Sequence, residues 1–304
     1  MKKKLVVIAG PTGSGKTALA IRLAQQLGIE IVSADSRQIF REMSIGTAQP
    51  SETELRTATH HLIGHLSVTE DYNAAKYAFE AESIINKLFE KYAVVLLCGG
   101  SGLYIDALLK GLDSIPEIPD EIRKELLKEF EIKGLKWLQK EAQALDPVWF
   151  GEADQDNPRR LLRCLEVLRA TGKKLSDFQK KKPAKHEWEV LKIGLDQPRP
   201  NLYQRIDQRV IEMVQAGLFE EVEALKEYRN LKALQTVGYR EIFDWMDGRV
   251  TKEKCIELIQ QHSRNYAKRQ LTWFRKDAEM KWINPGDSSA LEIITNWIQE
   301  GTDQ

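Results

Sequence analysis

The sequence contains few cysteines and no cysteine spacing that would hold a metal. Its 304 residues include only Cys98, Cys164 and Cys255, and none of them forms a CxxC or Cys/His pair. Disulfide frameworks and structural zinc sites depend on closely spaced pairs of this kind. The composition therefore argues against both and fits a reducing compartment.

Long apolar runs and a net charge are missing as well. No stretch approaches the ~18 apolar residues that cross a bilayer, and the run from Leu5 to Ala9 is too short for a signal peptide. Lysine and arginine (45) balance aspartate and glutamate (45), so any nucleic-acid surface must come from local segregation of charge. We expect a soluble cytoplasmic protein without a membrane segment.

Strands and helices alternate in the hydrophobic pattern of the first part of the chain. Buried strands are predicted at 4–9, 29–33 and 92–97, and helices at 16–27 and 73–91. This alternation predicts a parallel sheet with helices on both faces. After a returning strand at 189–195, the pattern predicts helices at 201–216, 218–228, 238–247, 251–276 and 289–299 and a short strand at 280–284.

The middle of the chain shows only helical patterns and an uneven charge. Residues 113–154 hold 11 acidic and 6 basic residues, whereas residues 157–185, which include Lys180–Lys182 and Lys185, hold 10 basic and 2 acidic residues. We therefore predict an α/β fold with a P-loop-type parallel sheet. Residues 1–112 and 189–304 would form the catalytic core, and residues 113–188 an all-helical insertion domain that contacts RNA.

A phosphate-binding loop follows the first predicted strand and precedes the first predicted helix. The pattern G-x-x-x-x-G-K-[ST] is met by residues 10–17. Backbone N–H groups at a helix N-terminus favour an anion, a lysine adds a full positive charge, and a threonine hydroxyl can bind Mg²⁺. The predicted diphosphate site comprises Gly10, Pro11, Thr12, Gly13, Ser14, Gly15, Lys16 and Thr17, with Thr17 as the Mg²⁺ ligand.

The third predicted strand lacks the acidic residue with which triphosphate-hydrolysing enzymes usually help to hold Mg²⁺. It runs instead into Cys98-Gly99-Gly100. This weakens an ATPase or motor interpretation. Mg²⁺ would be held mainly by Thr17, diphosphate oxygens and water.

A carboxylate follows the second predicted strand. Asp35 lies in SADSRQ, residues 33–38, and ligands of open parallel sheets bind beyond the carboxyl ends of the strands. Asp35 would then lie on the same rim as the phosphate loop, on strands that could be close neighbours, and could act as a general base. The alternative is an Asp/Ser turn or helix cap. Gln38 adds an amide that could contact a base edge.

Eleven blocks of the sequence resemble those of the tRNA dimethylallyltransferases, in the same order and over nearly the whole chain. They are GPTGSGKT (10–17), SADSRQIF (33–40), IGTAQP (45–50), HHLI (60–63), GGSGLYIDALL (99–109), NPRRLLRCLEV (157–167), TG (171–172), RIDQRV (205–210), GLFEEV (217–222), VGYRE (237–241) and YAKRQLTWFR (266–275). The resemblance implies transfer of a dimethylallyl group from dimethylallyl diphosphate to N6 of the adenosine just 3′ of the anticodon in tRNA. Gln49, Gly64 and Ser101 depart from the family's usual lysine, aspartate and threonine.

The resemblance also implies roles for individual residues. Arg209 would bind the diphosphate, Asp35 would accept the N6 proton, and Lys16 and Thr12 would contact the reacting groups. The target adenosine would be flipped out of its loop to reach them. Contacts to the tRNA anticodon stem-loop are expected from Asp35, Ser36, Arg37, Gln38, Ser101, Arg123, Arg159, Arg160, Leu161, Leu162, Arg163, Gly238, Tyr239, Arg240, Lys268, Arg269 and Gln270. We expect a monomer that uses Mg²⁺.

Three other functions remain open on the sequence. A small-molecule kinase would use the loop for ATP, and a prenyltransferase acting on free AMP or ADP would share the chemistry. Neither gives a purpose to the basic part of the insertion or to the helix predicted at 251–276. A non-catalytic RNA-binding module would not need the phosphate loop together with Asp35.

Overall fold

The computed structural model describes residues 2–113, 115–179 and 186–300, and the chain divides into two compact units. Residues 1–109 and 184–304 form the first unit, and residues 110–183 form the second. Trp188, which the sequence analysis placed in the insertion, packs in the core of the first unit. None of the helices in the described ranges is long and apolar enough to span a membrane.

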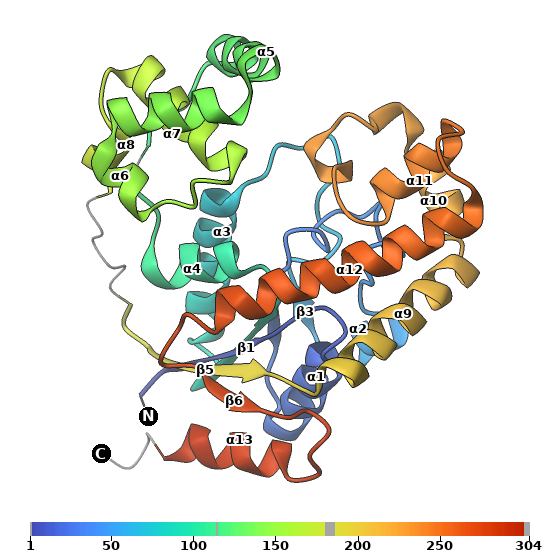
Figure 1. Ribbon diagram of the computed structural model, residues 1–304. Coiled ribbons are helices and arrows are strands. Elements are labelled where there is room, and N and C mark those ends of the chain that lie inside the picture. Colours follow the sequence, from blue (N-terminus) through green and yellow to red (C-terminus); the bar gives the residue numbers. More distant parts are fainter. Residues whose placement is uncertain (1, 114, 180–185, 301–304) are drawn as a thin grey trace. The chain divides into compact units, whose positions relative to one another are not determined.

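The first unit is built on a six-stranded sheet in the order β3-β2-β4-β1-β5-β6. Helices lie on both sides of this sheet (Figure 1). All five pairings are parallel, which confirms the predicted fold class. The strands β1 and β2 are not neighbours as the sequence analysis allowed, because β4 lies between them. The strands are β1 (Lys4–Ala9), β2 (Ile31–Ser33), β3 (His60–His61), β4 (Val94–Gly99), β5 (Glu189–Leu195) and β6 (Lys281–Ile283).

Helices surround this sheet. The predicted helix at 218–228 ends early, at Ala224, and a 3₁₀ turn follows it. The short elements α2, β3 and α4 were not predicted. The helices of this part are α1 (Lys16–Leu27), α2 (Glu52–Thr57), α3 (Ala74–Leu88), α4 (Gly102–Lys110), α9 (Arg199–Gln215), α10 (Leu218–Ala224), α11 (Tyr239–Met246), α12 (Lys252–Phe274) and α13 (Ala290–Gln299), with 3₁₀ turns η1 (Lys226–Tyr228) and η2 (Lys232–Leu234).

Both faces of the sheet are buried, which explains why the central strands are apolar without alternation. Successive side chains of a strand point to opposite faces. Accordingly, Leu5 and Val7 pack with α3 and α4 on one face, whereas Val6 and Ile8 pack with α1 and α13 on the other. The carboxyl ends of the strands are thereby held at one edge, where the loops that follow them meet.

The second unit is helical in its described residues. Its helices are α5 (Asp120–Leu145), α6 (Pro147–Glu152), α7 (Pro158–Thr171) and α8 (Leu175–Phe178). Gly134 interrupts α5 with a φ of 73°, so this helix consists of two segments. Asp146 joins the elements, because its carboxylate accepts hydrogen bonds from the N–H of Trp149 (3.2 Å) and from the N–H of Ser176 (2.9 Å).

Candidate active site

The phosphate loop joins β1 to α1, as predicted. Gly13 and Gly15 have φ angles of 77° and 88°, which side chains rarely adopt. Gly15 caps α1 without any side-chain cap hydrogen bond, so the helix N-terminus is left to an anion. The buried Oγ of Ser14 has no hydrogen-bond partner among the described residues. These features fit a bound diphosphate.

Lys16 lies at the start of α1, and its Nζ donates a hydrogen bond to the Pro11 carbonyl (2.7 Å). Burial lowers the pKa of Lys16 to about 8. Cys98 and Asp35 oppose this lowering of the pKa, and Arg209 adds to it. The lysine is therefore close to the candidate base and to the candidate diphosphate-binding arginine.

Asp35 follows β2 and forms the turn that the sequence analysis held open as an alternative. Its Oδ1 accepts hydrogen bonds from the N–H groups of Arg37 (2.9 Å) and Gln38 (3.3 Å). Within the described residues, Oδ2 has no hydrogen-bond partner. The turn thus orients the carboxylate through one oxygen and is compatible with proton transfer to the other.

The end of β4 brings the loops after β1 and β2 together. β4 pairs with both neighbours at this end, Cys98 with Ser33 and Gly99 with Ala9. A Cβ at Gly99 would lie 2.1 Å from the Ala34 carbonyl oxygen, so only glycine fits this contact. Burial raises the pKa of Cys98 to about 11, which keeps its thiol protonated beside Lys16.

Three tyrosines lie near enough to Asp35 for its charge to raise their pKa values. Tyr77 stacks on Tyr104 with 4.4 Å between the ring centroids, and the Tyr77 hydroxyl donates to the Ser33 carbonyl (3.0 Å). Burial, and next the charge of Asp35, raises the pKa of Tyr266 to about 12. The pKa of Tyr104 is also raised to about 12, mainly by burial. Aromatic rings near the candidate base could help to exclude water from it.

Ser101 connects the turn after β4 to the Asp35 turn. The N–H of Ser36 donates to Ser101 Oγ (2.8 Å), and Ser101 Oγ donates to Ser36 Oγ (3.1 Å). Ser101 stands where the family usually has threonine, and its hydroxyl supplies both contacts. Ser36 and Ser101 thus lie together at the carboxyl edge of the sheet.

Two glutamine amides hold the loop that follows Asp35. Gln38 Nε2 donates to the carbonyls of Thr47 (3.2 Å) and Ala48 (2.8 Å), so this donor is already engaged by the protein. Gln49 Nε2 donates to the carbonyls of Gln38 (3.0 Å) and Phe40 (2.8 Å). Gln49, at a position where the family usually has lysine, therefore serves to hold the loop.

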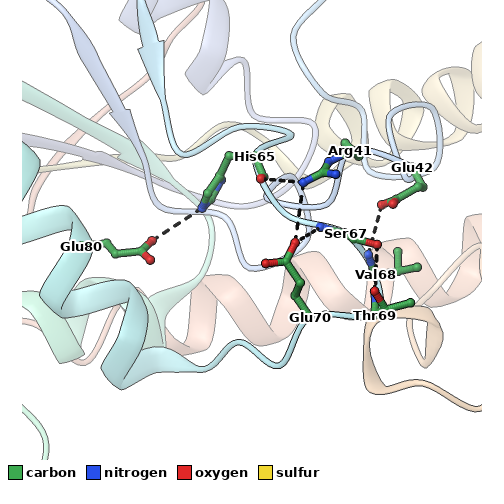
Figure 2. Close-up of polar contacts among 8 residues, drawn as sticks. All are labelled: Arg41, Glu42, His65, Ser67, Val68, Thr69, Glu70 and Glu80. Atoms are coloured by element: carbon green, nitrogen blue, oxygen red, sulfur yellow. Dashed lines mark hydrogen bonds and ion pairs between the residues drawn. The ribbon is translucent and has the colours of Figure 1, made fainter.

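The rest of the connection from β2 to α3 is held by its own polar contacts (Figure 2). Arg41 donates to the His65 carbonyl (2.9 Å) and pairs with Glu70 (3.6 Å), which in turn accepts from the N–H of Ser67 (2.7 Å). His65 also lies 3.6 Å from a carboxylate oxygen of Glu80 on α3. The loop carrying Gln38 and Gln49 is thus tied at its far end as well.

Arg205 and Arg209 of α9 lie beside the phosphate loop. They line an open hollow of about 840 Å³ together with Gly13 and Gln260. A Cβ at Gly15 would be 3.2 Å from a guanidinium nitrogen of Arg205, and burial, followed by the charge of Arg205, lowers the pKa of Arg209. Neither arginine forms an ion pair with the described acidic residues. Arg205 was not predicted from the sequence, although it lies one helical turn before Arg209 in the same block.

Four expected tRNA contacts are buried instead. Tyr239 is 0% exposed, and its hydroxyl donates to Glu221 Oε1 (2.6 Å). Gln270 is 7% exposed and bonds to the phosphate loop. In the helical unit, Leu161 and Leu162 are 0% and 7% exposed and belong to its apolar core. Helical phase turns these four side chains inward, so we expect exposed neighbours on the same helices, rather than these side chains, to contact tRNA.

The remaining expected contacts differ in their surroundings. Arg159, Arg160, Arg240, Lys268 and Arg269 are exposed. Arg37 donates to the carbonyls of Lys232 and Ala233 (3.0 Å each). Arg123 pairs with Asp120 (3.1 Å), and Arg163 pairs with Glu166 (3.4 Å). The buried N–H of Gly238 donates to Glu241 (2.7 Å). Lys180–Lys182 and Lys185, part of the expected basic wall, lie outside the described residues.

Side chains suited to metals do not gather elsewhere in the described ranges. No group of three or more His, Cys, Asp or Glu residues there could hold an ion. His61 Nε2 lies 2.7 Å from Glu30 Oε2, and His60 Nδ1 lies 2.7 Å from the Ala58 carbonyl oxygen. A Mg²⁺ ion at the phosphate loop would thus draw on the half-buried Thr17 and on the diphosphate itself.

Comparison with known proteins agrees with this geometry. The sequence model of the family described as IPP transferase matches residues 38–277. A tRNA dimethylallyltransferase of Cytophaga hutchinsonii is 45% identical over 98% of this chain and 97% of its own length, and tRNA dimethylallyltransferase 1 of Bacteroides thetaiotaomicron is 43% identical over 94% and 93%.

Solved structures lead to the same family. The tRNA isopentenylpyrophosphate transferase of Bacillus halodurans has a TM-score of 0.72 at 34% identity and covers 98% of this chain and 96% of its own. A eukaryotic dimethylallyltransferase acting on tRNA has a TM-score of 0.80 at 25% identity and covers 98% and 80%. The resemblance noted in the sequence is confirmed: the chain belongs to the tRNA dimethylallyltransferase family of IPP transferases.

Proposed function

We propose that this protein transfers the dimethylallyl group of dimethylallyl diphosphate to N6 of the adenosine 3′-adjacent to the anticodon in tRNA. The observation that carries the proposal is the position of Lys16 and Asp35 at one edge of the sheet, where the charge of Asp35 partly opposes the desolvation that lowers the pKa of Lys16. The proposed diphosphate-binding loop and the proposed base thus follow strands on either side of β4. The chain also matches relatives bearing this name over nearly its full length.

The reaction needs two kinds of help from the protein. The bond between C1 of the allyl group and the diphosphate oxygen breaks, N6 of adenine forms a bond to C1, and N6 loses a proton. The loop amides, Lys16 and Arg209 would bind the departing diphosphate. Asp35 would accept the proton through Oδ2, the oxygen not used in its turn.

Mg²⁺, when bound to the diphosphate, would supply further positive charge against the leaving group. Thr17 is the protein ligand that we propose for it. Because Cys98 occupies the end of β4, the protein offers no carboxylate there, and the donor oxygens and water would complete the coordination.

The tRNA would be bound by exposed cations. We propose Arg159 and Arg160 on α7, Arg240 on α11, and Lys268 and Arg269 on α12, all of which are exposed. The helical unit would then take part in tRNA binding, as the sequence analysis expects. A tRNA substrate also favours action in the cytoplasm, and a monomer remains our expectation.

One assay separates this function from its alternatives. The protein is incubated with Mg²⁺ and dimethylallyl diphosphate labelled in the allyl group, with either unmodified tRNA or AMP as the acceptor. We expect label in tRNA and none in AMP. Label in AMP would favour the free-nucleotide prenyltransferase, and no transfer together with consumption of ATP would favour the kinase.

A further inference from the structure

Gln270 differs from its neighbours on α12 in where its side chain lies. Lys268 and Arg269 are exposed, whereas Gln270 is 7% exposed and is one of few buried polar residues. Buried polar groups are normally retained where their hydrogen bonds are satisfied by the protein. The contacts of Gln270 therefore indicate its role better than its place in a basic block of sequence.

The Gln270 amide bridges two loops at the carboxyl edge of the sheet. Its Oε1 accepts a hydrogen bond from the N–H of Thr12 in the phosphate loop (2.9 Å). Its Nε2 donates to the carbonyl of Gly100, in the turn after β4 (2.8 Å). A primary amide can accept and donate at the same time, which a carboxylate or an ammonium group cannot do.

The Gln270 side chain packs closely against Gly100, where no side chain would fit beside it. A Cβ at Gly100 would lie 2.4 Å from Gln270 Nε2 and 3.4 Å from the Gly10 carbonyl oxygen. The turn after β4 therefore presses directly on both the glutamine and the first residue of the phosphate loop. Displacement of Gln270 would free the loop and this turn, which also carries Ser101, to move independently.

We propose that Gln270 is a positioning residue for the phosphate loop, and that it acts through Thr12 and Gly100 without contacting tRNA. The proposal rests on the proposed function only where tRNA is concerned. The geometry of the phosphate loop can be tested with pyrophosphate alone, whether or not the protein modifies tRNA. Outer-shell partners that orient the ligands of a metal site typically contribute about 10–100-fold in affinity or activity, and Gln270 would orient the phosphate loop in the same way. We expect a loss of this size for pyrophosphate.

The test compares Gln270→Met, which keeps the shape and removes both hydrogen bonds, with Gln261→Met, an exposed glutamine on the same helix. Calorimetry with inorganic pyrophosphate and Mg²⁺ should show an affinity about 10–100-fold lower for Gln270→Met and unchanged for Gln261→Met. The affinity for tRNA without donor should be unchanged in both. Unchanged pyrophosphate binding, or a loss confined to tRNA binding, would overturn the proposal.

A second variant guards against misfolding of the first. In Gln270→Glu the carboxyl can still accept from Thr12, but it can donate to Gly100 only when protonated. Burial raises the pKa of a carboxyl group, so pyrophosphate affinity relative to wild type should recover as the pH falls. A ratio that is flat with pH would contradict the positioning role. Recovery in a protein that modifies no tRNA would support this role and contradict the proposed function.

Discussion

Lys16 and Asp35 follow strands that are separated by β4, and yet the Asp35 carboxylate contributes to the pKa of the Lys16 ammonium. The chain places the proposed diphosphate-binding cation and the proposed base on either side of one strand end. Asp35 works against the desolvation that lowers the pKa of Lys16. The effect of Lys16 on donor binding and the effect of Asp35 on the chemical step should therefore be distinguishable by changes of pH and by substitution.

Donor binding should weaken as the pH rises above about 8, because burial lowers the pKa of Lys16 to about 8 and only its charged form attracts the diphosphate. The Lys16→Arg variant keeps its charge throughout this range. We compare the donor affinities of the wild type and Lys16→Arg as a ratio, because the donor's own titration then cancels. This ratio should fall about tenfold per pH unit above the pKa of Lys16. A ratio independent of pH from 7 to about 10 would contradict this.

Substitution of Asp35 should slow the chemistry and spare binding. In Asp35→Asn the amide oxygen can still accept from Arg37 and Gln38, so the turn is kept and only the base is lost. We expect kcat to fall by ~10²–10⁴, the usual contribution of a general base, with tRNA affinity largely retained. Asp35→Ala should lose the same chemistry and also the turn. Asp71→Asn, at an exposed loop position, is the control. Wild-type turnover by Asp35→Asn would remove Asp35 as the base.

The arginines of α9 should act mainly on the donor. Charge-assisted hydrogen bonds contribute about 1.5–3 kcal/mol, so Arg205→Met and Arg209→Met should each raise the KM for dimethylallyl diphosphate about 10–100-fold. Arg199→Met, an exposed position at the start of the same helix, should leave this KM unchanged. An effect on the KM for tRNA alone would place these arginines on the acceptor instead.

The exposed cations of α7 should set part of the salt dependence of tRNA binding. Arg159 and Arg160 form no ion pair with the described acidic residues, so both are available to phosphates. The double variant Arg159→Ala, Arg160→Ala should weaken tRNA binding and reduce the slope of log K against log salt concentration by about one unit per lost contact. Arg22→Ala, exposed on α1, is the control, and an equal slope for both variants would exclude this surface.

Leu161 should matter for stability rather than for RNA contact. It is 0% exposed in the core of the helical unit, and removing such a side chain typically costs about 2–5 kcal/mol of unfolding free energy. Leu127, which is 46% exposed on α5, provides the matched control. Chemical denaturation of Leu161→Ala and Leu127→Ala should separate the two. A stable Leu161→Ala with weak tRNA binding would restore the original assignment.

Local patterns in the sequence predicted the parts of the fold that depend on local physics. β5 begins and ends where the sequence predicted, at Glu189 and Leu195. The glycines of the phosphate loop predicted the turn between β1 and α1. The six-residue helix α2 was missed, although Ser51 and Glu54 form a capping box that could have indicated it. The two-residue strand β3 is too short to leave a pattern.

Long-range arrangement could not be predicted in the same way. The position of β4 between β1 and β2 is set by packing of both sheet faces, which no single segment encodes. Lys268 and Gln270 lie only two positions apart on α12 and belong to the same sequence block, yet Lys268 is exposed and Gln270 is buried. The block alone could not predict this difference. The inward phase of Tyr239 follows from its contact with Glu221, a residue 18 positions away.

The most direct test of the account is nucleoside analysis of tRNA after reaction. Unmodified tRNA is treated with the protein, Mg²⁺ and dimethylallyl diphosphate, digested, and examined by mass spectrometry with mapping of the modified position. We predict N6-dimethylallyladenosine at the position 3′-adjacent to the anticodon, formed by the wild type and nearly absent with Asp35→Asn. Unchanged tRNA, or a dimethylallyl group on another atom or nucleotide, would contradict it.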